Sequence, residues 1–273
     1  MSKDDSNLSY ISYISYFDIL GYEHLLKKFG GALGLAKIMD KHINGALTSI
    51  KTYSLFVEGF DEKNLEIRVF SDNFLIRSKA NKNGRLMLLS LVFALQTTML
   101  SDHIFIRGSI CKGELLFWDK FVCGQGLIDA YKIESKLAIF PRIIVDKDFF
   151  HRDAESVICL ENFISEDFDG LLFLDYLKYG MFLHEINRRD KDKISTIVEN
   201  LNKHGIKAMP ADNPGAKLLE VHRERIWKNI AQNVNRPEVL HKYMWCLKYH
   251  NNFCEQYGYD YLITPDYLTE LNK

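Results

Sequence analysis

Residues 9–20 read SYISYISYFDIL, a run dominated by aromatic and β-branched side chains. Such a run, ended by Gly21, predicts a strand whose two faces are both covered, and a helix is expected to begin at Tyr22. Asp18 departs from the apolar pattern. A carboxylate inside an apolar strand is costly unless it is paired, hydrogen-bonded or bound to a metal ion. The segment therefore predicts both a central strand and an acid with a special role.

A second acid follows in a predicted hairpin. Residues 65–70 (LEIRVF) alternate in polarity, and residues 74–76 (FLI) follow after the turn-forming triplet SDN. This pattern predicts a β-hairpin with Asp72 at its tip. In a palm-like sheet the first strand neighbours this hairpin, so Asp18 and Asp72 are expected to converge. Magnesium prefers a small number of carboxylates together with substrate phosphates.

Each acid also has a structural interpretation. Asp18 at the end of a strand would cap the helix that begins near Gly21, and Asp72 would be an ordinary turn residue. Either acid alone favours the structural interpretation, whereas their joint placement favours a metal site.

The remaining elements through residue 146 indicate an α+β fold. Strands are expected at residues 104–110, 114–117 and 141–146, with a tight turn at Lys112 and Gly113, and helices at residues 33–50, 84–100 and 127–137. The resulting order, β-α-α-β-β-α-β-β-α-β, mixes antiparallel hairpins with helices. That mixture is typical of an α+β sheet rather than a doubly wound one.

The pattern changes after residue 147. One more strand is expected at residues 170–174, followed by helices at residues 191–204, 216–234 and 237–256. We therefore divide the chain into a domain over residues 8–185 and a helical extension over residues 186–273, packed on the same core.

Composition excludes several function classes. With 35 basic and 36 acidic residues, the chain has no overall field that would draw it to nucleic acid or to a membrane surface. The five cysteines form no CxxC pair, so zinc is disfavoured. The sequence has no signal-like start and no apolar run near the roughly 20 residues that span a bilayer. We expect a reduced, cytoplasmic protein that binds neither membranes nor nucleic acid directly.

Four motifs, in order, resemble class III nucleotide cyclases. Residues 16–22 (YFDILGY) resemble the first-strand metal motif, and residues 70–72 (FSD) resemble the second. Residues 106–113 (IRGSICKG) resemble the strand that follows, and residues 124–134 (GQGLIDAYKIE) resemble the helix that completes the site across a dimer interface. The resemblance covers about residues 10–146. The residues of its motifs look closest to those of bacterial cyclase-like proteins that include the Pycsar anti-phage pyrimidine cyclases.

The resemblance implies a palm, ferredoxin-like mixed sheet and an activity. A nucleoside triphosphate, UTP or CTP in that group, would be converted to cyclic UMP or cyclic CMP and pyrophosphate, as a signal in antiviral defence. Two Mg²⁺ or Mn²⁺ ions per site would be held by Asp18, Asp72 and the backbone of Ile19. Lys132 would act from the second subunit of a head-to-tail homodimer with composite sites. The substrate would be bound by the following residues: Ile19, Leu20, Gly21, Tyr22, Arg68 and Tyr131.

Some positions depart from the family pattern. Ile128 and Lys132 stand where the family carries an asparagine and an arginine, and Glu23 stands beside the expected triphosphate. These departures leave open a second interpretation, a catalytically inactive cyclase-like module that binds a nucleotide or a partner. Arg68 can instead be interpreted as a solvent-facing strand residue. Arg107 can be interpreted either as a phosphate contact or as the partner of a surface acid. Another activity of this kind of fold, the linking of two nucleotides, would need a second acid beside Asp72. The residue at that position is Asn73.

Overall fold

The computed structural model describes residues 9–53, 64–149, 160–181 and 214–265. Its centre is a mixed eight-stranded sheet with the order β2-β3-β1-β4-β6-β8-β7, and β5 pairs with β4. Neighbouring strands are antiparallel except for the parallel pair of β4 and β6. The strands are β1 (Ser9–Ile19), β2 (Leu65–Phe70), β3 (Asn73–Lys79), β4 (Ile106–Trp118), β5 (Phe121–Cys123), β6 (Ile143–Val145), β7 (Ile164–Glu166) and β8 (Leu172–Leu174).

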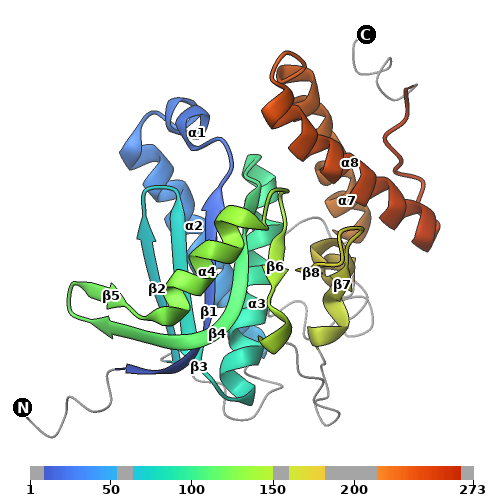
Figure 1. The fold of residues 1–273 in the computed structure, drawn as a ribbon. Helices are drawn as coiled ribbons and strands as arrows, with labels where there is room; N and C mark the ends of the chain where they lie inside the picture. Colours follow the sequence, from blue (N-terminus) through green and yellow to red (C-terminus); the bar gives the residue numbers. More distant parts are fainter. Residues whose placement is uncertain (1–8, 54–63, 150–159, 182–213, 266–273) are drawn as a thin grey trace, which may run out of the picture.

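Helices cover both faces of this sheet (Figure 1). They are α1 (Tyr22–Lys28), α2 (Ala32–Tyr53), α3 (Lys82–Met99), α4 (Gln125–Lys136), α7 (Pro214–Gln232) and α8 (Pro237–Tyr257), with short 3₁₀ turns at η3 (Leu100–Asp102), η4 (Lys147–Phe149) and η5 (Leu160–Phe163). The predicted α+β class with a mixed sheet is confirmed. The predicted elements through residue 146 are observed, except that the strands predicted over residues 104–110 and 114–117 form one strand, β4, and that β5 was not predicted.

Strand β1 has a buried partner layer on each side, as its apolar sequence predicts. Tyr13 and Phe17 belong to the large core that includes α2 and α3, whereas Ile14 and Tyr16 pack in a smaller cluster with Ala130 of α4. Successive strand residues point to opposite faces. Asp18, two residues after Tyr16, therefore belongs to the α4 face.

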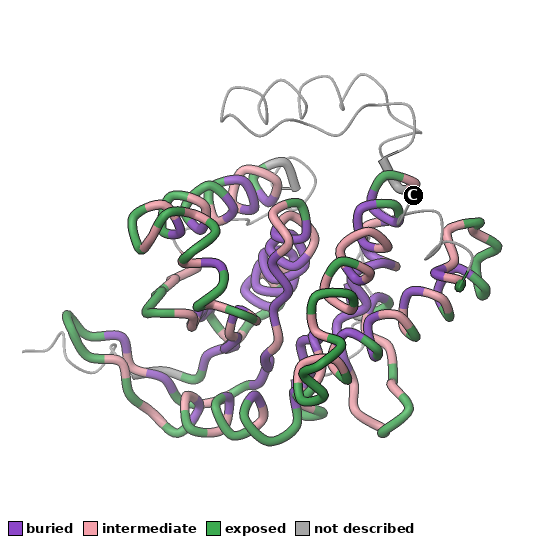
Figure 2. The backbone as a smooth tube through the Cα atoms, turned by 90° about the horizontal axis from the view of Figure 1, so that it is seen from above, coloured by how far each residue is buried: buried purple, intermediate pink, exposed green. Residues whose placement is uncertain are grey.

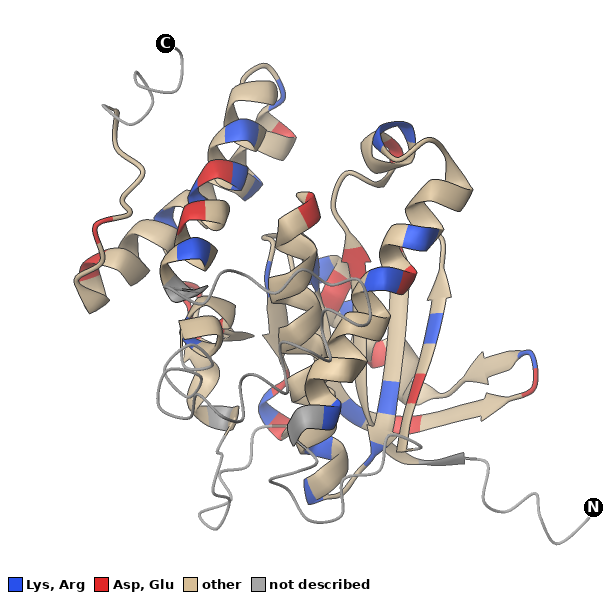
Figure 3. Cartoon of the chain, turned by 180° about the vertical axis from the view of Figure 1, so that it is seen from behind, with Lys and Arg blue, Asp and Glu red and all other residues tan. Residues whose placement is uncertain are grey.

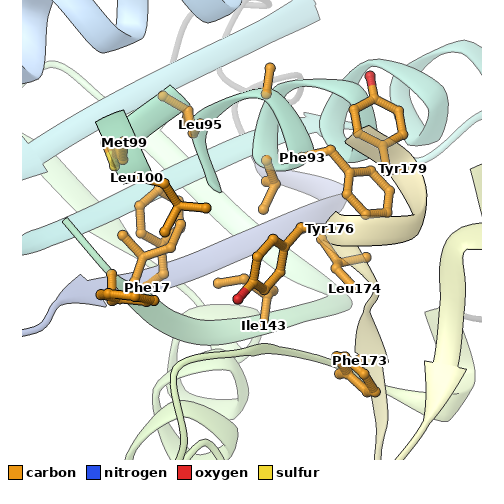
Figure 4. Packing of buried hydrophobic residues seen from close by; sticks show 14 of the residues in the cluster. Phe17, Phe93, Leu95, Met99, Leu100, Ile143, Phe173, Leu174, Tyr176 and Tyr179 are labelled. Atoms are coloured by element: carbon orange, nitrogen blue, oxygen red, sulfur yellow. The ribbon is translucent and has the colours of Figure 1, made fainter. Parts of the chain in front are cut away.

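The large core joins the sheet to the C-terminal helices. Figure 4 shows Phe17, Met99 and Leu100 gathered at one end of α3, with Tyr176 and Tyr179 of the segment after β8 packed alongside. Phe93 of α3 stacks on Tyr179 with ring centroids 4.3 Å apart. Leu219 of α7 and Tyr243 of α8 are buried in the same core.

One strand differs from the sequence-based prediction. The expected turn at Lys112 and Gly113 is absent, and β4 continues through both residues to Trp118. Gly113 pairs with Ser12 of β1. A Cβ atom there would lie 2.6 Å from the Cα atom of Gly126, so this glycine permits the start of α4 to approach the strand.

In the C-terminal part, the predicted helices over residues 216–234 and 237–256 correspond to α7 and α8, and the strand over residues 170–174 corresponds to β8. The helix predicted over residues 191–204 and the domain boundary at residue 185 lie outside the described residues, so the division into two domains stays a prediction. Acidic and basic side chains are mixed along α7 and α8 (Figure 3).

Contrary to the sequence-based expectation, helix α3 with η3, residues 82–102, is long and apolar enough by length and composition to cross a membrane. Its most apolar window is 78% buried inside the protein, as in the core helix of a folded domain. Buried residues are concentrated in the helix and strands at the centre of the fold (Figure 2).

Candidate active site

Strand pairing places Asp18 between two polar residues. In the register of β1, Asp18 lies opposite Asn73 of β3 and opposite Arg107 of β4. The backbone N–H of Ile19 donates to the carbonyl oxygen of Asp72 at 3.0 Å, which fixes the hairpin turn against the end of β1. Asp18 and Asp72 therefore lie at the same end of neighbouring strands, as the sequence predicted.

Asp18 is paired with Arg107. The Nε atom of Arg107 lies 3.0 Å and 3.1 Å from the two carboxylate oxygens of Asp18, and its Nη2 atom lies 3.0 Å from Oδ2. The same guanidinium lies 3.0 Å from Oε1 of Glu134 on α4, and it donates to the carbonyl oxygen of Ala138 at 3.3 Å. One arginine thus binds two carboxylates, which compensates their charge in a largely buried setting.

A hydrogen-bonded chain joins Asp72 to the sheet. The hydroxyl of Tyr16 donates to Oδ1 of Asn73 at 2.6 Å, and the amide of Asn73 donates to Oδ1 of Asp72 at 2.9 Å. The ring of Tyr16 also meets Tyr131 of α4 edge-on, with centroids 6.1 Å apart, and lies 6.4 Å from Phe70. Tyr16 therefore orients Asn73, which in turn orients Asp72.

Acidic side chains are in excess over Arg107 in this cluster. Burial raises the pKa of Asp18, Arg107 opposes that shift, and the charge of Asp72 adds to it. Burial likewise raises the pKa of Glu134, with Arg107 opposing and both Asp18 and Asp72 adding. Burial and the nearby acids raise the pKa of Tyr16 to about 12, so its hydroxyl stays protonated and donates its hydrogen bond.

The interpretation of Asp18 as a helix cap is wrong. Helix α1 has Gly21 at its N-cap, with φ 75° and no side-chain hydrogen bond, and the Asp18 carboxylate is turned to Arg107 instead. Gly21 suits this place because positive φ is a conformation that glycine adopts without strain. The N–H groups of Ile19 and Leu20 are bonded to the carbonyls of Asp72 and Phe105. The first backbone N–H groups after β1 that can face a ligand are therefore those of Gly21 and Tyr22.

Two predicted site residues lie apart from the cluster. Arg68 is exposed on β2, with its guanidinium 5.2 Å from the ring centroid of Phe117. The Lys132 side chain is 56% exposed on α4 and lies 3.9 Å from Asp129. Tyr131, in contrast, contacts Tyr16 and so borders the cluster.

The sequence analysis missed Glu134, Tyr16 and Asn73 as site residues, and it left the partner of Arg107 open. A signal for Glu134 was present, because it follows Ala130 by four residues on the buried face of α4. A glutamate on the apolar face of an amphipathic helix requires a buried cation. The signal for Tyr16 was its spacing of two from Asp18, which puts both on one face of the strand.

The donor set fits a hard divalent cation. Asp18, Asp72 and the backbone of Ile19 would supply only oxygen ligands, which Mg²⁺ and Mn²⁺ favour. Among the described residues, no group of three or more His, Cys, Asp or Glu side chains forms a metal cluster. To bind the ion, Asp18 would give up part of its contact with Arg107. Among the contacts described above, the only hydrogen-bond partner of the Asp72 carboxylate is the neutral amide of Asn73.

No protein-family model matches the chain, and no curated protein matches it in sequence. Solved structures similar to it include the guanylyl cyclase Cya2, at 13% identity and a TM-score of 0.33, covering 52% of this chain and 77% of that one. The catalytic core of a rhodopsin-guanylyl cyclase with converted specificity, in complex with ATPalphaS, gives 14% identity, a TM-score of 0.34 and coverage of 52% and 79%.

A class III adenylyl cyclase-like ATP-binding protein from Pseudomonas aeruginosa gives 11% identity and a TM-score of 0.34, over 62% of this chain and 39% of that one. Likenesses of this size bear no functional argument. The functional case therefore depends on the residues at the end of β1.

Proposed function

We propose that this protein is a nucleotide cyclase that converts a nucleoside triphosphate to a 3′,5′-cyclic mononucleotide and pyrophosphate. The observation that carries the proposal is the placement of Asp18 and Asp72 at one end of β1 and β3, beside Arg107. An excess of acids over Arg107, with raised pKa values at Asp18 and Glu134, is typical of a functional site.

Asp18, Asp72 and the backbone of Ile19 would hold two Mg²⁺ or Mn²⁺ ions. When bound, such ions supply activation of the ribose hydroxyl and neutralisation of charge on the α-phosphate and the leaving pyrophosphate. Arg107, released in part from Asp18, would contact the phosphates, since a guanidinium matches phosphate geometry. Tyr16 would keep Asn73 and Asp72 in place.

The other proposed substrate contacts surround this centre. Backbone N–H groups from Gly21 and Tyr22 onwards, after Ile19 and Leu20, would face the phosphates. Arg68 would read a carbonyl-bearing base edge and Tyr131 would stack on a base. A pyrimidine triphosphate, UTP or CTP, and a role in anti-phage signalling through cyclic UMP or cyclic CMP are proposed from the sequence resemblance.

A homodimer would complete each site. Exposed apolar side chains are found on α4, at Ile128 and Tyr131, and on the β4–β5 hairpin, at Trp118 and Phe121. Exposed aromatic and aliphatic side chains of this kind suit a protein interface. Lys132, which contacts none of Asp18, Asp72 or Arg107 in its own chain, would stabilise developing charge in the site of the partner subunit.

The test is turnover of each of the four nucleoside triphosphates with Mg²⁺ or Mn²⁺, read as pyrophosphate and cyclic product. Asp72→Ala is expected to abolish product, because it removes one of the two carboxylates. Asn64→Ala is the control, because Asn64 directly precedes β2 of the same hairpin, at the end away from Asp72. Equal activity of both variants would contradict the proposal.

Composite sites have a separate test. Mixing inactive Asp18→Ala and Lys132→Ala subunits is expected to restore part of the activity, because one hybrid site then contains both residues. Native mass spectrometry verifies that mixed dimers form. Verified mixed dimers without restored activity would exclude the action of Lys132 across the interface.

The second candidate function is a cyclase-like module that binds a nucleotide without turnover. The bidentate pairing of Arg107 with Asp18 favours it, because a carboxylate that stays bound to an arginine holds no metal ion. Nucleotide binding measured by calorimetry, with no product from any triphosphate, would select this function over the cyclase.

A further inference from the structure

Helix α8 of the C-terminal extension is docked beside the candidate site. The ring of Phe140 stacks on Trp245 with centroids 5.8 Å apart and an interplanar angle of 11°, and it meets His241 at 6.1 Å. His241 and Trp245 are four residues apart and so share one face of α8. Phe140 lies two residues after Ala138, whose carbonyl oxygen accepts from Arg107.

Trp245 of α8 is also held by residues that pack against the sheet. The indole N–H of Trp245 donates to Oδ2 of Asp167 at 2.8 Å, and Trp245 is buried. The guanidinium of Arg142 lies 5.7 Å from the ring centroid of Trp245 and is bound by Asp167. The loop between α4 and β6 therefore connects Arg107 to α8 through direct contacts.

Lys242 lies on α8 between His241 and Trp245, and it is half-buried. Burial lowers its pKa, the nearby Arg107 lowers it further, and Asp18 and Glu134 oppose the shift. Lys242 lies three residues before Trp245, on the side of α8 that packs on Phe140, and its charge interacts with those of Arg107, Asp18 and Glu134. Within the described part of the chain, no acceptor lies at hydrogen-bond or ion-pair distance from its ammonium group.

We propose that Lys242 is a substrate-positioning residue that binds the triphosphate of the nucleotide, so that the C-terminal extension forms one wall of the active site. A half-buried ammonium group without an acceptor at hydrogen-bond distance gains a partner when an anion binds. A polyphosphate satisfies this need, because its oxygens accept from both cations at once. This inference rests on the proposed nucleotide site, and it assigns that site a contact from outside the region that resembles cyclases.

The test is calorimetric binding, without turnover, of triphosphate analogues of all four nucleotides with a methylene group between the α- and β-phosphates. Lys242→Gln is expected to weaken triphosphate binding by about tenfold, because a charge-assisted hydrogen bond is lost, and to leave binding of the parent nucleosides unchanged. Lys242→Arg is expected to retain most of the affinity. Lys248→Gln is the matched control, since Lys248 is exposed on the same helix.

Salt dependence gives a second measurement on the same proteins. Triphosphate affinity of the natural protein is expected to fall more steeply with KCl than that of Lys242→Gln, because one ionic contact has been removed. Equal triphosphate affinity of Lys242→Gln and Lys248→Gln would overturn the inference, provided that both variants have the melting temperature of the natural protein. Equal loss of triphosphate and nucleoside binding would overturn it too, by assigning Lys242 a structural role.

The outcome is independent of turnover. A protein that binds triphosphates through Lys242 and makes no cyclic product refutes the cyclase and supports this inference. A protein that makes product with unchanged KM in Lys242→Gln supports the cyclase and refutes this inference.

Discussion

Two arginines of this protein, the buried Arg142 and the partly buried Arg107, are each bound by two carboxylates, and the two clusters differ in the donors that their acids find. The clamp cluster consists of Arg142 with Asp167 and Asp169, below α8. The site cluster consists of Arg107 with Asp18 and Glu134, between β1 and α4. The residue types are nearly the same in both.

In the clamp cluster, other donors share the acids. Asp167 also accepts from the backbone N–H of Phe168 at 2.7 Å and from the indole of Trp245. Burial alone would raise the pKa of Asp169, but Arg142 and the backbone N–H of Leu171 hold it below its usual value. The ionised form of Asp169 is therefore stabilised by folding.

In the site cluster, Arg107 is the principal donor, and Asp72 adds a third negative charge nearby. The pKa values of Asp18 and Glu134 are raised rather than lowered. Side chains of the same types thus stabilise the fold in the clamp cluster and hold unbalanced charge in the site cluster. Unbalanced buried charge is typical of a site that awaits a ligand.

The largest expected effect is at the clamp. Arg142→Ala is expected to cost about 3–5 kcal/mol of unfolding free energy, because it leaves two carboxylates beneath α8 without their cation. Urea denaturation at neutral pH measures this loss. A cost below about 1 kcal/mol would show that the clamp does not hold α8 on the core.

Arg107→Ala is expected to cost less at neutral pH, and its cost should shrink as the pH falls. Asp18 and Glu134 already have raised pKa values and, without Arg107, protonate more readily. The cost of Arg142→Ala should persist to lower pH, because the pKa of Asp169 is depressed in the natural protein. Unfolding free energies of both variants between pH 4 and pH 7 compare them, and parallel pH profiles would contradict the distinction.

Two neutral substitutions should act with opposite signs. A raised pKa in the folded state means that ionised Glu134 opposes folding above that pKa, so Glu134→Gln is expected to leave stability at pH 7 unchanged or higher. A depressed pKa means that ionised Asp169 supports folding above its unfolded value, so Asp169→Asn is expected to lose about 1 kcal/mol at pH 7. Thermal melts at pH 7 and pH 4 test the signs, and a loss in both variants at pH 7 would refute the contrast.

The last prediction concerns Tyr16, where the expected loss of stability is similar to that of Asp169→Asn. Tyr16→Phe removes the hydroxyl that donates to Asn73 and is expected to cost about 1 kcal/mol, with a larger fractional loss of turnover because Asp72 is no longer oriented. Tyr13→Phe is the control, because Tyr13 is buried on the opposite face of the same strand. Equal loss of turnover in the two variants would exclude a positioning role for Tyr16.

Much of the fold could be predicted from local patterns. The strand at residues 9–20, the hairpin with Asp72 at its tip and the helices α7 and α8 follow from alternation, turn chemistry and helical periodicity, which are properties of neighbouring residues. The continuous course of β4 through Gly113 could not be predicted, because it depends on pairing with β1, in which Gly113 lies opposite Ser12.

The sequence by itself determined that Asp18 needs a buried partner and that Asp72 lies in a turn, because burial and turn propensity depend on local composition. Only the tertiary structure decided that the partner is Arg107, that Glu134 shares it and that α8 packs on the loop whose Ala138 carbonyl accepts from Arg107. Those neighbours come from strands, a helix and an extension far apart in the chain. Their meeting is fixed by strand register and helix docking, which depend on the packing of the whole core.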